Sequence, residues 1–291
     1  MSDKYKRVDL RLKPFTGSGG FILPPHAQMS KNQFLRSPNG RYQFIYQDDG
    51  NIALYDGTTT IWVADKTAQY SSSLTRQVWH DVKTAFYLYY NLTLIDVEKR
   101  REWQTVASDP LGGIQLAADR TYMQLQDDGN LVIVDQYPRW SASGVPTLDA
   151  EQPATIIPAG TMMNPGDSFH IGKSRLVFQG DGNLVFYGEN DLVFWASYTQ
   201  NKGGAFAAMQ DDGNFVIYNS THQPIWSTKT AGFPDAYARI QENGCFAIVT
   251  DRVCWARFGF TPSIKPVRTI SFGGNPYKDG LPTYDRVVWT F

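Results

Sequence analysis

The sequence has few cysteines, few charges and no long apolar run. Its 291 residues include two cysteines, and charged residues make up 19% of the chain with a formal net charge of −1. Two cysteines cannot form the disulfide framework of a small secreted domain, and a near-neutral chain has no electrostatic footprint for a nucleic-acid partner. No stretch approaches the roughly eighteen apolar residues of a membrane-spanning helix. Nucleic acids and membrane spanning are therefore not expected.

Signals for export and for catalysis are also missing. The charged residues 1–7 lead into no apolar segment, so no Sec signal peptide is predicted. The four histidines are isolated, and no His-Glu-x-x-His, Gly-x-Ser-x-Gly or phosphate-binding loop occurs. We therefore expect no catalytic residue, no metal site and no cofactor. Cys245 and Cys254 flank one predicted hairpin, which leaves both a mutual disulfide and two free thiols open.

Turn formers and aromatic residues are abundant. Aromatic residues make up 14% of the chain, which also holds 25 glycines and 16 prolines. This mixture is typical of turn-rich β proteins and poor for long helices. The length suits two domains, each able to bury its own core.

One short string recurs along the chain. Gln-Asp-Asp-Gly-Asn occurs at 47–51, 126–130 and 210–214, and Gln-Gly-Asp-Gly-Asn occurs at 179–183. Asp-Gly before alternating residues is the strongest short-range hairpin signal, because a tight turn needs a positive φ that glycine adopts without strain. Each repeat is therefore predicted to be a strand ending at Gln, a turn, and a strand starting at Asn.

Two weaker copies, with Asn91 and Cys245 in the place of that Asn, complete three repeats in each half. Six of the eight tryptophans follow these anchor positions by ten to twelve residues: Trp62, Trp103 and Trp140 in the first half, and Trp195, Trp226 and Trp255 in the second. Three related units should bring their tryptophans together on a pseudo-threefold axis. The spacing predicts two duplicated domains, joined by the segment 141–153, which is rich in Ser, Pro, Gly and Ala.

Alternation in the second strand of each repeat separates a core face from an outer face. In the 179–187 copy, Leu184 and Phe186 should point into the core, and Val185 should point outward with the polar residues of the repeat. Gln, Asp and Asn could merely satisfy turn backbone groups. Turn chemistry does not explain why Val and Tyr recur with them at a period of two. An acceptor, an amide, an apolar contact and a hydroxyl together suit the edge of a sugar.

The pattern Gln-x-Asp-x-Asn-x-Val-x-Tyr, intact or altered in three repeats per domain and accompanied by a tryptophan core, resembles the monocot mannose-binding lectins, or B-lectins. That resemblance implies an all-β fold of two tandem β-prism II domains, each pseudo-threefold, over 1–147 and 148–262, with a C-terminal extension at 263–291. The tandem arrangement and the aromatic tail ending Trp289-Thr290-Phe291 look more like the lectin-like bacteriocins of the putidacin L type. The alternation of Val287, Trp289 and Phe291 predicts that this tail packs back on the body.

The pattern is intact in two copies, and the resemblance implies that these bind sugar. In the first, Asp181 and Asn183 would contact the axial 2-hydroxyl, Gln179 the 3-hydroxyl and Tyr187 the 4-hydroxyl, while Val185 would lie against the ring carbons. The second set repeats these roles: Gln210, Asp212, Asn214, Val216 and Tyr218. Ala53 replaces the valine in a further copy, so weaker binding is expected at Gln47, Asp49, Asn51 and Tyr55.

The other three copies depart further from the pattern. Val134 removes the phenol from the 126–134 copy, and the 87–95 and 241–249 copies have lost more of the motif. They are expected to complete the prism rather than to bind.

The bacteriocin resemblance implies a monomeric, non-enzymatic toxin. It would be released to the extracellular medium and would bind D-rhamnose, and more weakly D-mannose, in the lipopolysaccharide O-antigen of related Gram-negative bacteria. An outer-membrane protein of the target, the β-barrel assembly machinery, would be the further partner. A non-toxic mannose- or rhamnose-binding agglutinin or adhesin is the alternative, since it would share every site named above.

Two other classes are weighed against these. A glycosidase needs two carboxylates at a defined separation, which a sequence cannot exclude; turnover of a rhamnan or mannan would establish it. A calcium-binding loop needs further acidic ligands and a closing Glu that the Asp-x-Asp-Gly strings lack. Sugar binding that survives EDTA would exclude a calcium-dependent site.

Overall fold

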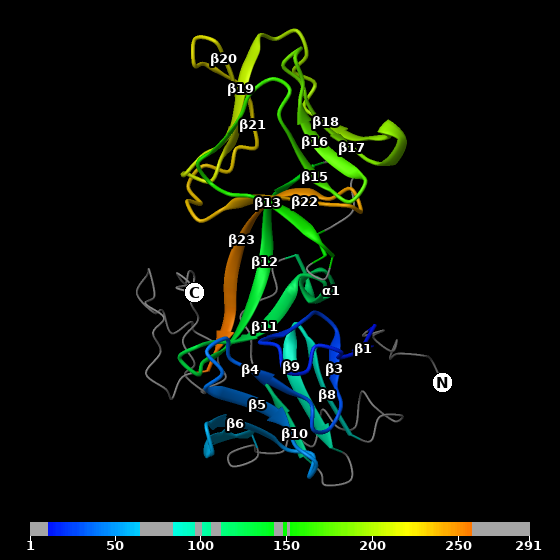
Figure 1. Ribbon diagram of the computed structural model, residues 1–291, viewed down its shortest axis with the longest axis vertical. Helices are drawn as coiled ribbons and strands as arrows, with labels where there is room; N and C mark the ends of the chain where they lie inside the picture. The colour runs from blue at the N-terminus through cyan, green and yellow to red at the C-terminus, as the bar shows by residue number, and fades with distance from the viewer. Residues whose placement is uncertain are drawn as a thin grey trace, which may run out of the picture. The chain divides into compact units, whose positions relative to one another are not determined.

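The chain is an all-β protein of short strands joined by tight turns, as a computed structural model shows (Figure 1). The structure describes residues 11–64, 84–96, 101–105, 112–142, 148–149 and 152–257. The helical elements within these ranges include the short helix α1 (Ile114–Ala118) and a 3-10 turn, η2 (Glu189–Asp191). None of the described helices is both long and apolar enough to cross a membrane.

Two compact units divide the chain. The described residues up to Asp135, with those from Arg252 onward, form unit 1, and Gln136–Asp251 form unit 2. The sequence-based division into 1–147 and 148–262 has the same number of parts. The boundaries differ, because residues 136–142 belong to unit 2 and residues 252–257 belong to unit 1. The predicted extension at 263–291 lies outside the described residues.

Unit 2 has three four-stranded sheets. The first has the order β14 (Thr161–Met163), β19 (Gly204–Met209), β20 (Phe215–Asn219) and β21 (Pro224–Ser227). The second has the order β15 (Ser168–Ile171), β16 (Ser174–Phe178), β17 (Leu184–Tyr187) and β18 (Val193–Ala196). In the third, β13 (Ala154–Ile157) and β22 (Tyr237–Gln241) are followed by parts of β23 (Phe246–Ala256) and β12 (Leu131–Ser141).

Unit 1 is built in the same way. One sheet has the order β4 (Phe34–Arg36), β5 (Tyr42–Tyr46), β6 (Ile52–Asp56) and β7 (Thr59–Val63). Another has the order β1 (Lys13–Pro14), β3 (Ala27–Met29), β8 (Thr84–Tyr89), β9 (Asn91–Asp96) and β10 (Arg101–Gln104). In the third, β2 (Ile22–Leu23) and β11 (Thr121–Leu125) are followed by the remaining parts of β12 and β23.

Strands β12 and β23 are each 11 residues long and run through both units, so the outer strand of each third sheet is exchanged (green and orange in Figure 1). In unit 2 the ring of Trp140 lies 5.6 Å from that of Trp195 and 5.8 Å from that of Trp226. In unit 1 the ring of Trp103 lies 5.3 Å from that of Trp62 and 6.4 Å from that of Trp255. The predicted tryptophan axes exist, but the predicted grouping was wrong: Trp140 and Trp255 have changed places.

The side chains around each tryptophan cluster follow the predicted alternation. Leu184, Phe186, Phe215 and Ile217 are fully buried in the core of unit 2. Phe246, from the exchanged sheet, lies 5.2 Å from the Trp140 ring. Three sheets around a shared aromatic core form the pseudo-threefold prism, so the predicted fold class is confirmed.

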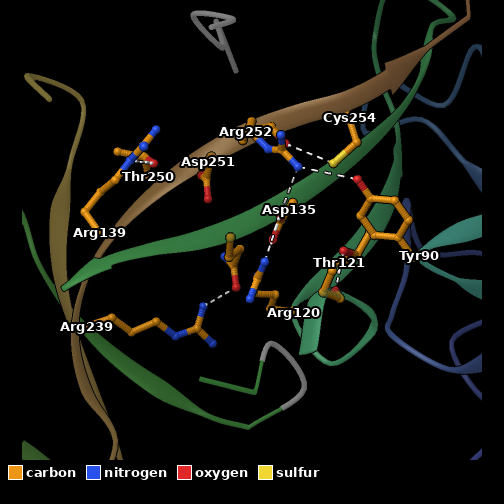
Figure 2. A network of polar contacts seen from close by, with 12 residues as sticks. Tyr90, Arg120, Thr121, Asp135, Arg139, Arg239, Thr250, Asp251, Arg252 and Cys254 are labelled. Carbon is orange, nitrogen blue, oxygen red and sulfur yellow. Dashed lines mark hydrogen bonds and ion pairs between the residues drawn. The ribbon is translucent and has the colours of Figure 1, made fainter. Parts of the chain in front are cut away.

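A buried polar network closes the third sheet of unit 1 (Figure 2). Asp135 is fully buried, and its carboxylate accepts hydrogen bonds from Arg120 Nε at 2.5 Å and from Arg252 Nη2 at 3.3 Å. Arg252 Nη2 also donates to the Tyr90 hydroxyl at 3.4 Å. A buried carboxylate is costly unless it is paired and hydrogen-bonded, so these contacts fix the exchanged strand β23 in unit 1.

Both cysteines are free and buried, which decides between the two alternatives left open by the sequence. Burial is the largest cause that raises the pKa of Cys245, to about 11, and that of Cys254, to about 12. Both pKa values lie above the ordinary 9.0 of an exposed thiol. The protonated thiols therefore contribute stability below about pH 9, and this contribution is lost as the pH rises through the folded-state values.

We expect iodoacetamide at mildly alkaline pH to leave both thiols of the folded chain unmodified, because the thiolate is the reactive form and neither thiol is exposed. In denaturant, both should be alkylated within minutes. Mass spectrometry of the intact chain measures this, and rapid modification of Cys245 or Cys254 without denaturant would contradict it.

Candidate functional site

The candidate site begins at the hairpin turn that precedes β17. Gln179 N donates to Asn183 O at 2.8 Å, and Gly182 N donates to Gln179 O at 3.0 Å. Gly182 has a φ of +81°, and a Cβ there would lie 2.8 Å from the backbone nitrogen of Gly204. Only glycine fits this position. The turn fixes which residues of the two strands face each other, and thereby places the residues of the motif side by side.

An aspartate holds the turn and faces solvent. Asp181 Oδ1 accepts the backbone N–H of Asn183 at 3.0 Å, and Asp212 Oδ1 accepts that of Asn214 at 2.9 Å. Both aspartates are exposed. One carboxylate oxygen therefore serves the turn, and the other is available to accept a hydroxyl proton.

A glutamine and a tyrosine from opposite strands meet beside this turn. Gln179 Nε2 donates to the Tyr187 hydroxyl at 2.9 Å, and Gln210 Nε2 donates to the Tyr218 hydroxyl at 2.8 Å. Because each phenol oxygen accepts from the amide, its own proton can be given to a ligand. Each set of predicted polar residues is thus brought together on one outer face, two polar pairs to a site.

The valines form the floor of this face. Val185 is 3% exposed and Val216 is 2% exposed. They lie on the opposite side of the strand from the core residues, as the alternation predicted. Both valines are almost fully buried, so each patch consists of a polar rim with an apolar floor beneath it.

The two tyrosines have different neighbours. The Arg175 guanidinium lies 4.8 Å from the ring centre of Tyr187 and pairs with Asp191 at 2.5 Å. The Tyr218 ring instead stacks on Phe206, with 5.1 Å between ring centres and 19° between planes. Each ring is supported from below, which reduces the rotamer freedom that ligand binding would have to restrict.

A pair of hydroxyl residues behind each Asn was not predicted from the sequence. Ser197 and Thr199 contact Asn183, and Thr228 and Thr230 contact Asn214. The signal was present: two and four residues after Trp195 and Trp226 stand Ser or Thr and then Thr. These residues lie too far along the chain from the turn to belong to the repeated motif.

The 47–55 copy of the motif has the same polar rim with one difference. Gln47 Nε2 donates to the Tyr55 hydroxyl at 2.9 Å, and Asp49 Oδ1 accepts the backbone N–H of Asn51 at 2.9 Å. Ala53 is 1% exposed and stands where the other copies have valine. The residues of the predicted weaker site therefore lie together in unit 1, with a shorter apolar side chain as their floor.

Two of the remaining copies are covered by protein. In the 126–134 copy, Asn130, Val132 and Val134 are fully buried. In the 241–249 copy, Leu148 packs on Cys245, Ala247 and Val249.

The linker also hydrogen-bonds to the first polar residue of the 241–249 copy: Gln241 Nε2 donates to Asp149 O at 2.6 Å. In the 87–95 copy, Tyr87 and Tyr89 replace the Gln and the Asp, and both are buried. These positions contribute to the structure of the prism and present no polar rim like that of the other three. Among the described residues, no group of three or more His, Cys, Asp or Glu is placed to hold a metal ion.

Comparison with protein-family models and with curated proteins gives no match. Among solved structures, the chain is similar to monocot lectins. The two-domain fetuin-binding agglutinin of Scilla campanulata is 17% identical, with 84% of this chain and 97% of that chain covered at a TM-score of 0.42.

The mannose-specific agglutinin of snowdrop (Galanthus nivalis), solved with methyl-α-D-mannoside, is 30% identical, with 32% of this chain and 86% of that chain covered at a TM-score of 0.30. The monomeric mannose-binding lectins of Gastrodia elata are 28% identical, with 36% and 97% covered at a TM-score of 0.29.

Proposed function

We propose that the chain is a lectin and that its sites at 179–187 and 210–218 each bind one sugar of the D-mannose or D-rhamnose configuration. One observation carries this: the Gln–Tyr pair and the Asp–Asn pair recur with the same atoms and nearly the same distances in both copies. A structural turn alone requires only the Asp–Asn pair. The repeated second pair, over a valine, matches a row of vicinal hydroxyls.

Each polar group has a partner on such a sugar. The outer oxygen of Asp181 accepts from the axial 2-hydroxyl, and the amide of Asn183 donates to it. The carbonyl of Gln179 accepts from the 3-hydroxyl, while its Nε2 donates one proton to the phenol. The Tyr187 hydroxyl donates to the 4-hydroxyl, and the ring carbons lie over Val185. D-rhamnose lacks only the 6-hydroxyl of D-mannose, which none of these groups contacts.

Two sites on one unit explain how weak contacts become useful. A shallow patch for one monosaccharide binds at about 1 mM, or about 4 kcal/mol. Both intact sites belong to unit 2, so a polysaccharide that reaches both gains roughly two to four orders of magnitude through effective concentration. The ligand is therefore a polymer that repeats the sugar.

The polymer is the lipopolysaccharide O-antigen of related Gram-negative bacteria, and the chain is a monomeric, lectin-like bacteriocin released to the medium. It kills at the outer surface of the target without enzymatic activity, through the β-barrel assembly machinery of the outer membrane. The tandem repeat and its resemblance to the putidacin L type support this. The non-toxic agglutinin shares the sites and differs only in its effect on cells.

We expect growth-inhibition spots of the purified chain on a panel of related bacteria to show clearing on strains with a D-rhamnose O-antigen. Isogenic strains without O-antigen should be inhibited much less, because they lack the polymer that both sites can bind at once. Glycan-array binding of the same preparation gives the sugar preference independently, with and without EDTA. Binding to rhamnose polymers with no inhibition of any strain would favour the non-toxic agglutinin over the bacteriocin. Binding to no mannose or rhamnose glycan would overturn the lectin assignment.

A further inference from the structure

The hairpins at 47–55, 179–187 and 210–218 share a buried backbone N–H directly after the Asn of the motif. It belongs to Ile52, Leu184 and Phe215, which are all fully buried. A buried N–H without an acceptor is costly, so each of these must find one. The three hairpins do so in two different ways.

In unit 2 a side-chain hydroxyl accepts this N–H. Leu184 N donates to Ser197 Oγ at 3.0 Å, and Ser197 Oγ donates its own proton to Asn183 Oδ1 at 3.0 Å. In the other site, Phe215 N donates to Thr228 Oγ1 at 3.0 Å, and Thr228 Oγ1 donates to Asn214 Oδ1 at 3.1 Å. The hydroxyl thus joins the backbone N–H to the side-chain amide.

A second donor fixes which way each amide is turned. Thr199 N donates to Asn183 Oδ1 at 3.1 Å, and Thr230 N donates to Asn214 Oδ1 at 3.2 Å. A backbone N–H can only donate, so the atom that receives it must be the amide oxygen. The Nδ2 group is then on the other branch of the amide, away from these donors, where its protons can serve a sugar hydroxyl.

The hairpin of unit 1 lacks the hydroxyl. Strand registers pair Ala53 with Val63 and Val185 with Ala196, so Ala64 stands where Ser197 does. Without a hydroxyl at that position, Ile52 N donates to Asn51 Oδ1 at 2.9 Å. The Asn51 amide has turned back on its own strand to satisfy the buried N–H.

We propose that Ser197 and Thr228 are positioning residues, which relieve Asn183 and Asn214 of the backbone N–H and hold each amide ready to donate to a sugar hydroxyl. This inference rests on the proposed function. It also assigns a second cause to the weakness of the 47–55 site: Ala64 leaves Asn51 engaged with Ile52, in addition to the smaller floor at Ala53.

A purely structural role for the hydroxyl has a built-in control. In the 87–95 copy, Leu92 N donates to Thr105 Oγ1 at 3.0 Å, and Thr105 is 2% exposed. The hydroxyl accepts the equivalent N–H there, but the hairpin has Tyr87 and Tyr89 in place of the Gln and the Asp. Removing this hydroxyl tests the backbone role alone.

The experiment compares three variants of the full chain with the unmodified chain: the double variant Ser197→Ala with Thr228→Val, the exchange Ser197→Thr with Thr228→Ser, and Thr105→Val. Each is titrated with methyl α-D-mannoside and with methyl α-D-rhamnoside by NMR, and each is melted to follow stability. In the double variant we expect binding to weaken about tenfold, because Asn183 and Asn214 turn to the backbone as Asn51 does. The exchange should bind like the unmodified chain, and Thr105→Val should lose comparable stability with its affinity unchanged.

The outcomes separate this inference from the function it rests on. If the unmodified chain binds neither glycoside, the proposed lectin function fails. If the unmodified chain binds and the double variant binds equally well, the positioning role fails while the lectin function stands. An equal loss of affinity in Thr105→Val would also overturn it, because the effect would then follow stability rather than the amide.

Discussion

Replacing Asp181 and Asp212 together by asparagine should strongly reduce polysaccharide capture while leaving the fold intact. In each hairpin, one carboxylate oxygen accepts the backbone N–H of the following Asn, and the oxygen of an asparagine side chain can still do so. The second oxygen becomes an NH2 group, which cannot accept the proton of the 2-hydroxyl.

The size of this effect follows from charge and from avidity. A hydrogen bond to a charged group contributes about 1.5 to 3 kcal/mol, so each site should weaken by at least tenfold. Because capture depends on both sites at once, the loss multiplies, and retention on a rhamnose- or mannose-polymer surface should fall by at least about a hundredfold. Surface plasmon resonance on immobilised polysaccharide measures it directly.

The chain offers a matched control in unit 1. Asp128 Oδ1 accepts the backbone N–H of Asn130 at 2.8 Å, as in the two intact sites. That hairpin has Val134 in place of the tyrosine, and Asn130 is fully buried. Asp128→Asn should therefore leave capture unchanged. Undiminished capture by the Asp181→Asn, Asp212→Asn double variant would mean that sugar binds elsewhere.

The rim of the site was predictable because it depends on short-range geometry. The Asp-Gly turn fixes the register of the hairpin, and the period of two then decides which residues share a face. Gln179 and Tyr187 could therefore be placed on one patch from their spacing, and the structure joins them by a hydrogen bond. The roles of these residues toward a sugar stay a prediction.

The residues behind the rim were harder to predict, because they depend on contacts between segments that the repeat does not include. Ser197 approaches Asn183 from the next strand, and Leu148 reaches the 241–249 copy from the linker. Neither position belongs to the motif. The consequence of Ala64 likewise appears only when the strand registers of the hairpins are compared.

The exchange of tryptophans was not predicted, although the spacing differs slightly. Trp140 and Trp255 follow their anchors by ten residues, whereas the other four tryptophans follow theirs by eleven or twelve. The strands differ more clearly: β12 and β23 have 11 residues each, whereas β17 and β18 have four. A residue at the end of such a long strand can join a different core from a residue at its beginning.

Trp140→Ala should therefore destabilise unit 2, although residue 140 belongs to the first half of the sequence. Its ring contacts those of Trp195, Trp226 and Phe246, with ring centres 5.2 to 5.8 Å apart. Removing an aromatic side chain from a core costs about 3 to 5 kcal/mol, a large part of the 5 to 15 kcal/mol by which a typical domain is stable. Both proposed sugar sites lie in unit 2, so affinity should fall together with stability when the temperature is raised.

Hydrogen exchange followed by mass spectrometry locates the effect. In Trp140→Ala, amides of β16 and β20 should lose protection while those of β5 and β6 keep it, and Trp255→Ala should show the reverse, because its ring lies 6.4 Å from that of Trp103 in unit 1. The two variants remove the same side chain from equivalent strands, so each controls for the other. Loss of protection in β5 and β6 on replacing Trp140 would mean that each half of the sequence builds its own tryptophan core and that no strand is exchanged.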